Sequence, residues 1–210
     1  MLNPGDYKGN YKLIGGLICF DFTNTVSWRE TEHPHEWFDS FDNFTKWTEI
    51  TDILEKEQAK ELLKTLQGSR EEGERHLNKM IETREFLFNL FNHLVQEGSV
   101  RPDDLQRLGV LGQSAYNHQM LAPSGSSYQW TWRNDISPLD KIHYAVIGAA
   151  LEVITRHDLS RIKKCPSCQW LYMDVSKNKS RRWCTMEDCG NRHKVNAFNQ
   201  NKKRQSKKAK

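Results

Sequence analysis

The stretch Cys165-Pro-Ser-Cys168 and, after fifteen intervening residues, Cys184-Thr-Met-Glu-Asp-Cys189 decides how the last third of this chain folds. It holds four of the five cysteines. Two residues between the first pair allow a tight turn to aim both sulfurs at one point, and four between the second pair suit a turn into a helix. Four thiolates around a tetrahedral Zn²⁺ form a closed structural site with no open position for a substrate water. We therefore predict one structural zinc ion.

Two disulfides are the competing interpretation of these cysteines. The N-terminus, Met-Leu-Asn-Pro-Gly-Asp, lacks the basic-then-apolar layout of a signal peptide. We therefore expect a cytoplasmic protein, and a reducing compartment disfavours disulfides. Cys19 lies in an apolar stretch and is predicted to be an inert core thiol. The segment around the four cysteines has almost no apolar core of its own, so we expect zinc to supply its folding energy, on the order of 10 kcal/mol.

The residues between and after the cysteine pairs predict a knuckle, a hairpin and a helix. Trp170-Leu-Tyr-Met-Asp174 is typical of a strand, residues 176–180 of a turn, and a helix is expected from about Glu187. This order is that of a treble-clef arrangement.

The rest of the chain is predicted to be mainly helical. Periodic apolar residues and capping signals predict helices over residues 41–50, from Thr51 or Asp52 to Leu66, over 72–95 with Gly98 as the stop, over 102–111 and over 138–156. Leu13–Phe22 and residues 127–133 are predicted to be strands. We thus expect a mainly α fold: a helical N-terminal domain (1–160) with a few short strands, a small treble-clef-like zinc finger (161–200) and a disordered basic tail (201–210).

Charge divides the chain into an acidic body and a basic end. Residues 161–210 carry 15 of the 31 Lys and Arg but only three of the 27 Asp and Glu, which leaves the first 160 residues with a net charge of −8. A basic end attracts polyanions.

The apolar stretches Leu13–Phe22 and Ile142–Ile154 are too short to span a membrane, so no membrane partner is expected.

Cys189-Gly190-Asn191-Arg192, together with the surrounding Asp174, Arg181, Arg182, Trp183 and Met186, closely resembles the CGNR zinc finger, which is named after those four residues. Gly15 to Thr25 (Gly-Gly-Leu-Ile-Cys-Phe-Asp-Phe-Thr-Asn-Thr) is similar to the opening of the ABATE domain. In that family the domain precedes the finger in bacterial stress-linked transcription regulators. The resemblance covers nearly the whole chain and implies a ligand-sensing N-terminal domain and a DNA-binding finger.

Five residues are candidate contacts to nucleic acid. On a helix after the last ligand, Arg192 can pair with guanine, Asn191 with adenine and Lys194 with phosphate, while Arg181 and Arg182 suit flanking phosphates. Two structural alternatives stay open: Asn191 caps the helix, or Arg182 or Arg192 braces the finger by pairing with Asp174. One finger offers little contact surface, so a homodimer or the basic tail would have to add affinity.

Five residues of the N-terminal domain are candidate ligand contacts. Asp21, Asn24 and Thr25 follow an apolar run and could line a pocket, and Arg29 and Arg84 could pair with an anionic ligand. The alternative for Asp21 and Asn24 is helix or turn capping.

The favoured function is a DNA-binding transcription regulator that is not an enzyme. The chain has neither a glycine-rich phosphate loop nor a nucleophile elbow. The rivals are a zinc-dependent module that binds RNA or an acidic protein, and an enzyme acting through the polar cluster 21–25.

Overall fold

The structure, a computed structural model, describes residues 11–208, with side chains up to Asn199. Helices dominate, and three antiparallel two-stranded sheets pair β1 with β2, β3 with β4 and β5 with β6. The mainly α class with a treble-clef-like finger is confirmed. The helices are α1 (Ile18–Thr23), α2 (Phe41–Ile50), α3 (Lys56–Gly68), α4 (Arg70–Glu97), α5 (Pro102–Asn117), α6 (Pro138–Arg156) and α7 (Asn191–Lys208). The strands are β1 (Val26–Ser27), β2 (His35–Glu36), β3 (Gln119–Ser124), β4 (Ser127–Trp132), β5 (Ile162–Lys164) and β6 (Leu171–Met173).

The core lies where α1 packs against α4 and α6. Phe20 of α1 meets Phe91 of α4 edge-to-face, with 5.0 Å between the ring centroids, and both are fully buried. The ends of the two long helices follow from their capping residues. Gly98 closes α4 in the left-handed conformation at φ 74°, and the Ser137 side chain accepts a hydrogen bond from the Asp140 N–H at the start of α6.

The strand predicted at Leu13–Phe22 is wrong, because its second half forms α1. A short apolar run fits a buried helix as well as a strand, and only its surroundings decide between them. Here Gly16, at φ 83°, turns the chain into the helix. The Asp21 carboxylate accepts the Gly15 N–H at 2.8 Å, a local bond that an extended chain could not make.

Other element boundaries also differ from prediction. Helix α3 begins at Lys56 through a capping box between Glu55 and Gln58, whereas the predicted cap residue Thr51 ends α2. Helix α5 runs on to Asn117, and the sequence does not predict strand β3, which pairs with the predicted β4.

The finger shares the main core instead of folding as a separate module. Strands β5 and β6 pack against α4 and α1, and their buried Ile162, Leu171 and Met173 belong to the same apolar cluster as Phe20 and Phe91. The hairpin thus buries its apolar residues in the core of the N-terminal body, a contact that the sequence does not predict.

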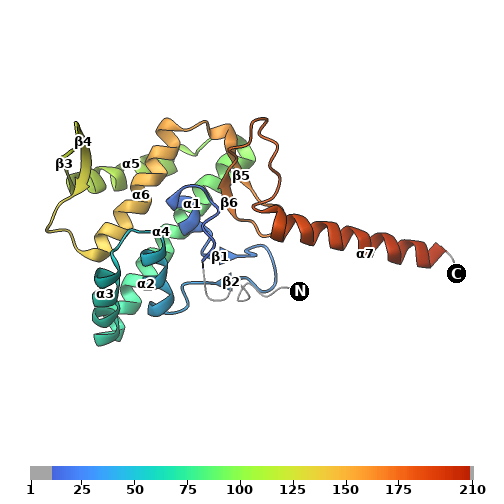
Figure 1. Cartoon of the computed structure of the whole chain (residues 1–210), viewed down its shortest axis with the longest axis horizontal. Helices are drawn as coiled ribbons and strands as arrows, with labels where there is room; N and C mark the ends of the chain where they lie inside the picture. Colours follow the sequence, from blue (N-terminus) through green and yellow to red (C-terminus); the bar gives the residue numbers. More distant parts are fainter. Residues whose placement is uncertain (1–10, 209–210) are drawn as a thin grey trace.

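Helix α7 leaves the body as a single rod, and the β3–β4 hairpin lies at the opposite end of the molecule (Figure 1). The predicted disordered tail is helical over residues 201–208, because this segment contains neither Gly nor Pro to stop α7. Residues 209–210 lie outside the described part. No helix within residues 11–208 is long and apolar enough to cross a membrane.

Candidate metal centre and nucleic-acid interface

The four predicted zinc ligands meet at one point. Cys165 follows β5, Cys168 lies in the turn before β6, and Cys184 and Cys189 flank the turn into α7. All four are buried, and their sulfurs lie within 4.8 Å of one another. The Sγ atoms of Cys168 and Cys184 are 3.5 Å apart, and those of Cys184 and Cys189 are 3.4 Å apart.

These distances fit a metal ion and not a disulfide. Four sulfurs at about 2.3 Å from a tetrahedral Zn²⁺ are about 3.8 Å from one another, whereas bonded sulfurs are about 2.05 Å apart. None of the five cysteines forms a disulfide. Among the described residues, the four cysteines are the one group of His, Cys, Asp and Glu arranged to hold a metal. The donor set and spacing are those of a structural metal centre.

A tight turn positions the second cysteine pair. The Thr185 hydroxyl accepts the Asp188 N–H at 3.2 Å, and the Asp188 carboxylate forms an ion pair with Lys12 at 2.7 Å. A Cβ on Gly190 would come within 2.8 Å of the Met186 sulfur, so a larger residue there would displace the exposed Met186 side chain from its place over the turn. The contact between Met186 and Gly190 explains why both residues belong to the sequence motif.

Asp174 braces the hairpin from inside. Its carboxylate accepts hydrogen bonds from the Lys163 ammonium at 2.6 Å, the Ser176 N–H at 2.9 Å and the Arg181 N–H at 3.0 Å. Burial alone would raise the pKa of Asp174, but the bonds from Lys163 and Ser176 outweigh it and hold that pKa well below its usual range. The alternative in which Arg182 or Arg192 pairs with Asp174 is therefore wrong.

Arg181 is committed to the finger. Its guanidinium lies over the Tyr172 ring at 4.4 Å and donates to the backbone carbonyls of Trp183, at 3.1 Å, and Cys184. A guanidinium held by carbonyls and an aromatic ring has few donors left for a phosphate. Arg182, the next residue, is exposed and lies over the Trp183 ring at 5.0 Å.

The three predicted nucleic-acid contacts on α7 differ in their exposure and in the protein contacts they already make. Asn191 is exposed but donates to the Glu187 carbonyl at 3.0 Å, as the capping alternative proposed. Arg192 is half-buried and lies over the Trp28 ring at 4.9 Å, while Lys194 is exposed. Arg182 and Lys194 are thus the most accessible of the five predicted contacts.

Trp28 is a contact that the sequence did not reveal. Its backbone N–H donates to the Cys168 carbonyl at 3.1 Å, and its ring packs against the cysteine cluster and under Arg192. It joins the N-terminal body to the root of α7. Only its aromatic character signalled burial, since its 140-residue separation from Cys168 hides the contact.

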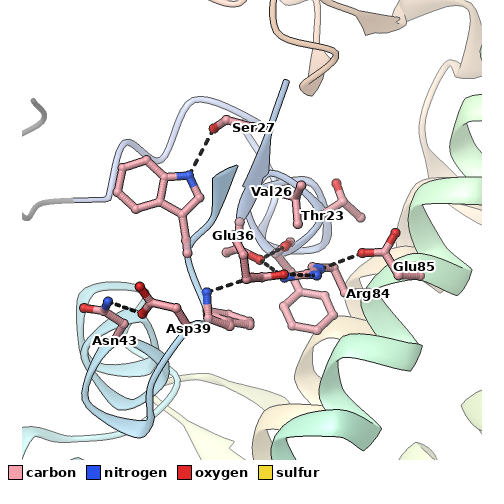
Figure 2. A network of polar contacts seen from close by, with 12 residues as sticks. Thr23, Val26, Ser27, Glu36, Asp39, Asn43, Arg84 and Glu85 are labelled. Atoms are coloured by element: carbon pink, nitrogen blue, oxygen red, sulfur yellow. Dashed lines mark hydrogen bonds and ion pairs between the residues drawn. The ribbon is translucent and has the colours of Figure 1, made fainter. Parts of the chain in front are cut away.

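The arginines predicted to meet a ligand bind the protein itself. Figure 2 shows Arg84 reaching from α4 to Glu36 of β2 and to Glu85. The guanidinium pairs with both Glu36 oxygens, at 2.6 and 2.7 Å, and reaches the Thr25 hydroxyl at 3.2 Å. Arg29 pairs with Glu85 and lies over the Phe88 ring at 4.0 Å. Glu36 is thereby a structural ion-pair partner.

Asp21 and Asn24 are both satisfied by backbone groups: Asp21 accepts a local bond from the Gly15 N–H, in line with the capping alternative, whereas the Asn24 side chain bonds a distant strand. Asn24 exchanges two hydrogen bonds with Leu171. Burial raises the pKa of Asp21 to about 6, and the Gly15 and Ile14 N–H groups partly offset this rise. The cavity beside them measures about 10 Å³, room for one water. The ligand pocket predicted for Asp21, Asn24, Thr25, Arg29 and Arg84 is therefore replaced by a network of structural contacts.

Two family models match the chain. Residues 16–157 match ABATE, described as "putative stress-induced transcription regulator", and residues 161–202 match the CGNR zinc finger. A comparison with individual curated proteins found no match. Because the first match covers more than half of the 210 residues, the chain belongs to the ABATE family, and a CGNR zinc finger follows the ABATE domain.

Proposed function

We propose that this ABATE-family chain is a DNA-binding transcription regulator of the reducing cytoplasm, with one structural Zn²⁺ and an N-terminal body that senses a small molecule during stress. The observation that carries the proposal is the place of the cysteine cluster. Cys165 and Cys168 belong to the hairpin that packs on the body, whereas Cys184 and Cys189 lie at the root of α7. An ion shared by both pairs would fix the direction of α7.

The zinc ion would act as a structural bridge, because four thiolates leave it no open position. Cys165, Cys168, Cys184 and Cys189 would hold it. The protein contacts around them, above all Asp174 with Arg181 and Trp28 with Cys168, orient the two halves of the site.

Helix α7 supplies the charge that DNA requires. Its 18 residues contain seven Lys and Arg and no Asp or Glu. An α-helix fits the major groove, where side chains of its first turns reach base edges. Arg192 is the candidate reader of guanine, Asn191 that of adenine, and Arg182 and Lys194 are candidate phosphate contacts. Arg181, although predicted to contact phosphate, is assigned a bracing role.

One finger contacts too little DNA for tight binding, since a single module buries about 600–1,000 Å². We infer that the basic continuation of α7 or a homodimer adds the rest. Binding carried by such charges weakens steeply with salt, with a slope of about −0.9 per phosphate neutralised. A salt-insensitive complex would contradict the proposal.

Selection from a random duplex library with the zinc-loaded chain tests the function. An enriched motif is expected, and Arg192→Ala should relax the selection at one position, whereas Lys194→Ala should weaken all sequences alike. Selection from an RNA library and a pull-down with acidic proteins run in parallel. No duplex enrichment, with binding in either parallel experiment, would assign the basic helix to the RNA- or protein-binding alternative instead.

A further inference from the structure

A groove opens between α5, α6 and the β3–β4 hairpin, far from the metal centre and from the polar network of the N-terminal body. Its volume is about 340 Å³, within the usual range of about 300–1,000 Å³ for small-molecule sites. One wall of the groove is formed by small residues of α6, whose short side chains leave the groove unfilled. Aromatic and small side chains dominate the lining: Tyr116, Trp130, Trp132 and Tyr144, with Ala145, Gly148 and Ala149.

The hairpin that covers the groove has an unusual composition. Residues 119–132 contain no Asp, Glu, Lys or Arg, in a chain that is 28% charged. Yet Trp130 is 58% and Leu121 59% exposed, and the two are directly paired across the strands. Large apolar side chains gathered on a surface mark a binding site. Trp130 also meets Tyr116 of α5 edge-to-face, at 6.1 Å between centroids, which holds the hairpin to the helices.

Two opposite charges line the same groove without protein partners. Glu152 and Arg156 lie one turn apart on α6, a spacing that often pairs such residues. Neither forms a hydrogen bond or ion pair with another side chain among the described residues. A ligand that carries both charges would satisfy Glu152 and Arg156 together.

We propose that this groove binds a small aromatic zwitterion of the aromatic α-amino acid class. The ring stacks among Trp130, Trp132 and Tyr144, the ammonium group pairs with Glu152, and the carboxylate pairs with Arg156. Planar rings stack favourably on Trp and Tyr, and a cation beside such rings gains further attraction. Binding itself does not depend on DNA recognition; only its meaning as the sensed signal rests on the proposed function.

Calorimetric titration of the full zinc-loaded chain with three probes tests the proposal. L-tryptophan carries both charges, tryptamine only the cation and indole-3-acetate only the anion. We expect L-tryptophan to bind tightest. Glu152→Gln should weaken L-tryptophan and tryptamine about tenfold but not indole-3-acetate, and Arg156→Gln should weaken L-tryptophan and indole-3-acetate but not tryptamine. Glu97→Gln, at the end of α4, is the control for a carboxylate near a helix C-terminus.

A second pair of variants separates binding from folding. A Cβ on Gly148 would meet nothing within 4 Å, so Gly148→Leu fills the groove while it raises helix propensity. Gly109 of α5 has the same open space but does not line the groove, so Gly109→Leu is the matched control. We expect Gly148→Leu to lose at least tenfold in affinity for L-tryptophan with no loss of thermal stability, and Gly109→Leu to bind as the unmodified chain does.

Two results would overturn the proposal. The first is that none of the probes binds, and the second is that singly charged probes bind as tightly as L-tryptophan. If the first is accompanied by a homodimer that Trp130→Ala dissociates, the groove would be assigned to a second copy of the chain. Because these titrations contain no nucleic acid, their failure leaves DNA binding untested, and the duplex selection can fail while they succeed.

Discussion

Asn24 and Leu171 exchange two hydrogen bonds across 147 residues: the Asn24 amide donates to the Leu171 carbonyl at 2.8 Å and its oxygen accepts the Leu171 N–H at 2.8 Å. Both residues are buried. The Asn24 side chain thus bonds the backbone of β6 as a neighbouring strand would. Strand β6 is one of the two strands of the hairpin at the metal centre. The Asn24 side chain therefore ties the finger to the body independently of any metal.

Asn24→Ala should destabilise the chain by about 2–4 kcal/mol, because it leaves the N–H and carbonyl of Leu171 buried without partners. Urea unfolding followed by circular dichroism measures this loss. Asn78→Ala, on the exposed face of α4, is the control and should leave the stability unchanged or slightly raised. A loss below about 1 kcal/mol for Asn24→Ala would mean that water replaces both bonds.

Removal of the metal should lower the stability of the whole chain and not only that of the finger. The reason is that Ile162, Leu171 and Met173 sit in the main core. We expect a chelator, or Cys168→Ser, to lower the midpoint of the main thermal transition by roughly 5–10 °C. Sequence reasoning alone predicts a helical body that stays folded without zinc. An unchanged midpoint, with only the nucleic-acid binding lost, would support that simpler interpretation.

Arg84→Met should cost about 2–3 kcal/mol, because it removes the buried partner of Glu36 and Glu85. The loss is smaller than the 3–5 kcal/mol of a fully buried pair, since the Glu side chains are 38% exposed and water can solvate them. Urea unfolding of this variant is compared with that of Arg70→Met, whose exposed ion pair with Glu74 should contribute nothing measurable. Equal stabilities of the two variants would contradict a structural role for Arg84.

The elements predicted correctly from sequence are those whose ends carry local signals. Helix α6 begins at Ser137-Pro138 and α4 ends at Gly98, and both signals lie within a few residues of the boundary they set. Strand β3 lacks such a signal: Gln-Met-Leu-Ala-Pro-Ser has no alternation and contains Pro123, and β3 becomes a strand by pairing with β4. The sequence does not predict helix α1, because Gly16 and the bond between Gly15 and Asp21, and not the apolar residues of α1, decide its conformation.

The same division applies to the site. Four cysteines with fixed spacing carry their chemistry in the sequence, so the cluster could be predicted. The partners of Arg84 and Asn24 could not, because Glu36 and Leu171 lie 48 and 147 residues away and are brought near only by tertiary packing. A polar residue in a sequence shows what it can bind, but the fold decides whether the protein itself already binds it.

His143 should make the chain less stable in acid. Burial, helped by the positive charge of Lys79 and opposed by Asp140, lowers the pKa of His143 from 6.5 to about 4. The unfolded chain therefore binds more protons than the folded one between these values, and the unfolding free energy falls as pH drops from about 6.5 to 4. The slope from this residue reaches at most about 1.4 kcal/mol per pH unit.

Chemical unfolding of the unmodified chain and of His143→Gln at several pH values measures this slope, which the variant should lose. Asp21 acts in the opposite sense, because its raised pKa of about 6 means that the folded chain gains stability as pH falls through 6. Asp21→Asn should therefore steepen the acid loss. Parallel profiles for all three proteins would rule out both assignments.

Arg181 and Arg182 are neighbours in sequence, but their substitution by Ala should have different effects on zinc retention. Arg181 is bound to the Trp183 and Cys184 carbonyls and to the Tyr172 ring, so Arg181→Ala should loosen the metal centre and speed zinc release to a chelator dye. Arg182 is exposed, so Arg182→Ala should keep zinc as the unmodified chain does.

Nucleic-acid titrations over a range of salt complete this comparison. If Arg182 contacts a phosphate, Arg182→Ala should lower the salt slope by about 1, as Lys194→Ala should, whereas Arg181→Ala at saturating zinc should leave the slope unchanged. The opposite pattern, normal zinc retention with a lowered slope in Arg181→Ala, would return Arg181 to the phosphate contact that its sequence position predicts. Its carbonyl contacts would then have to open on binding.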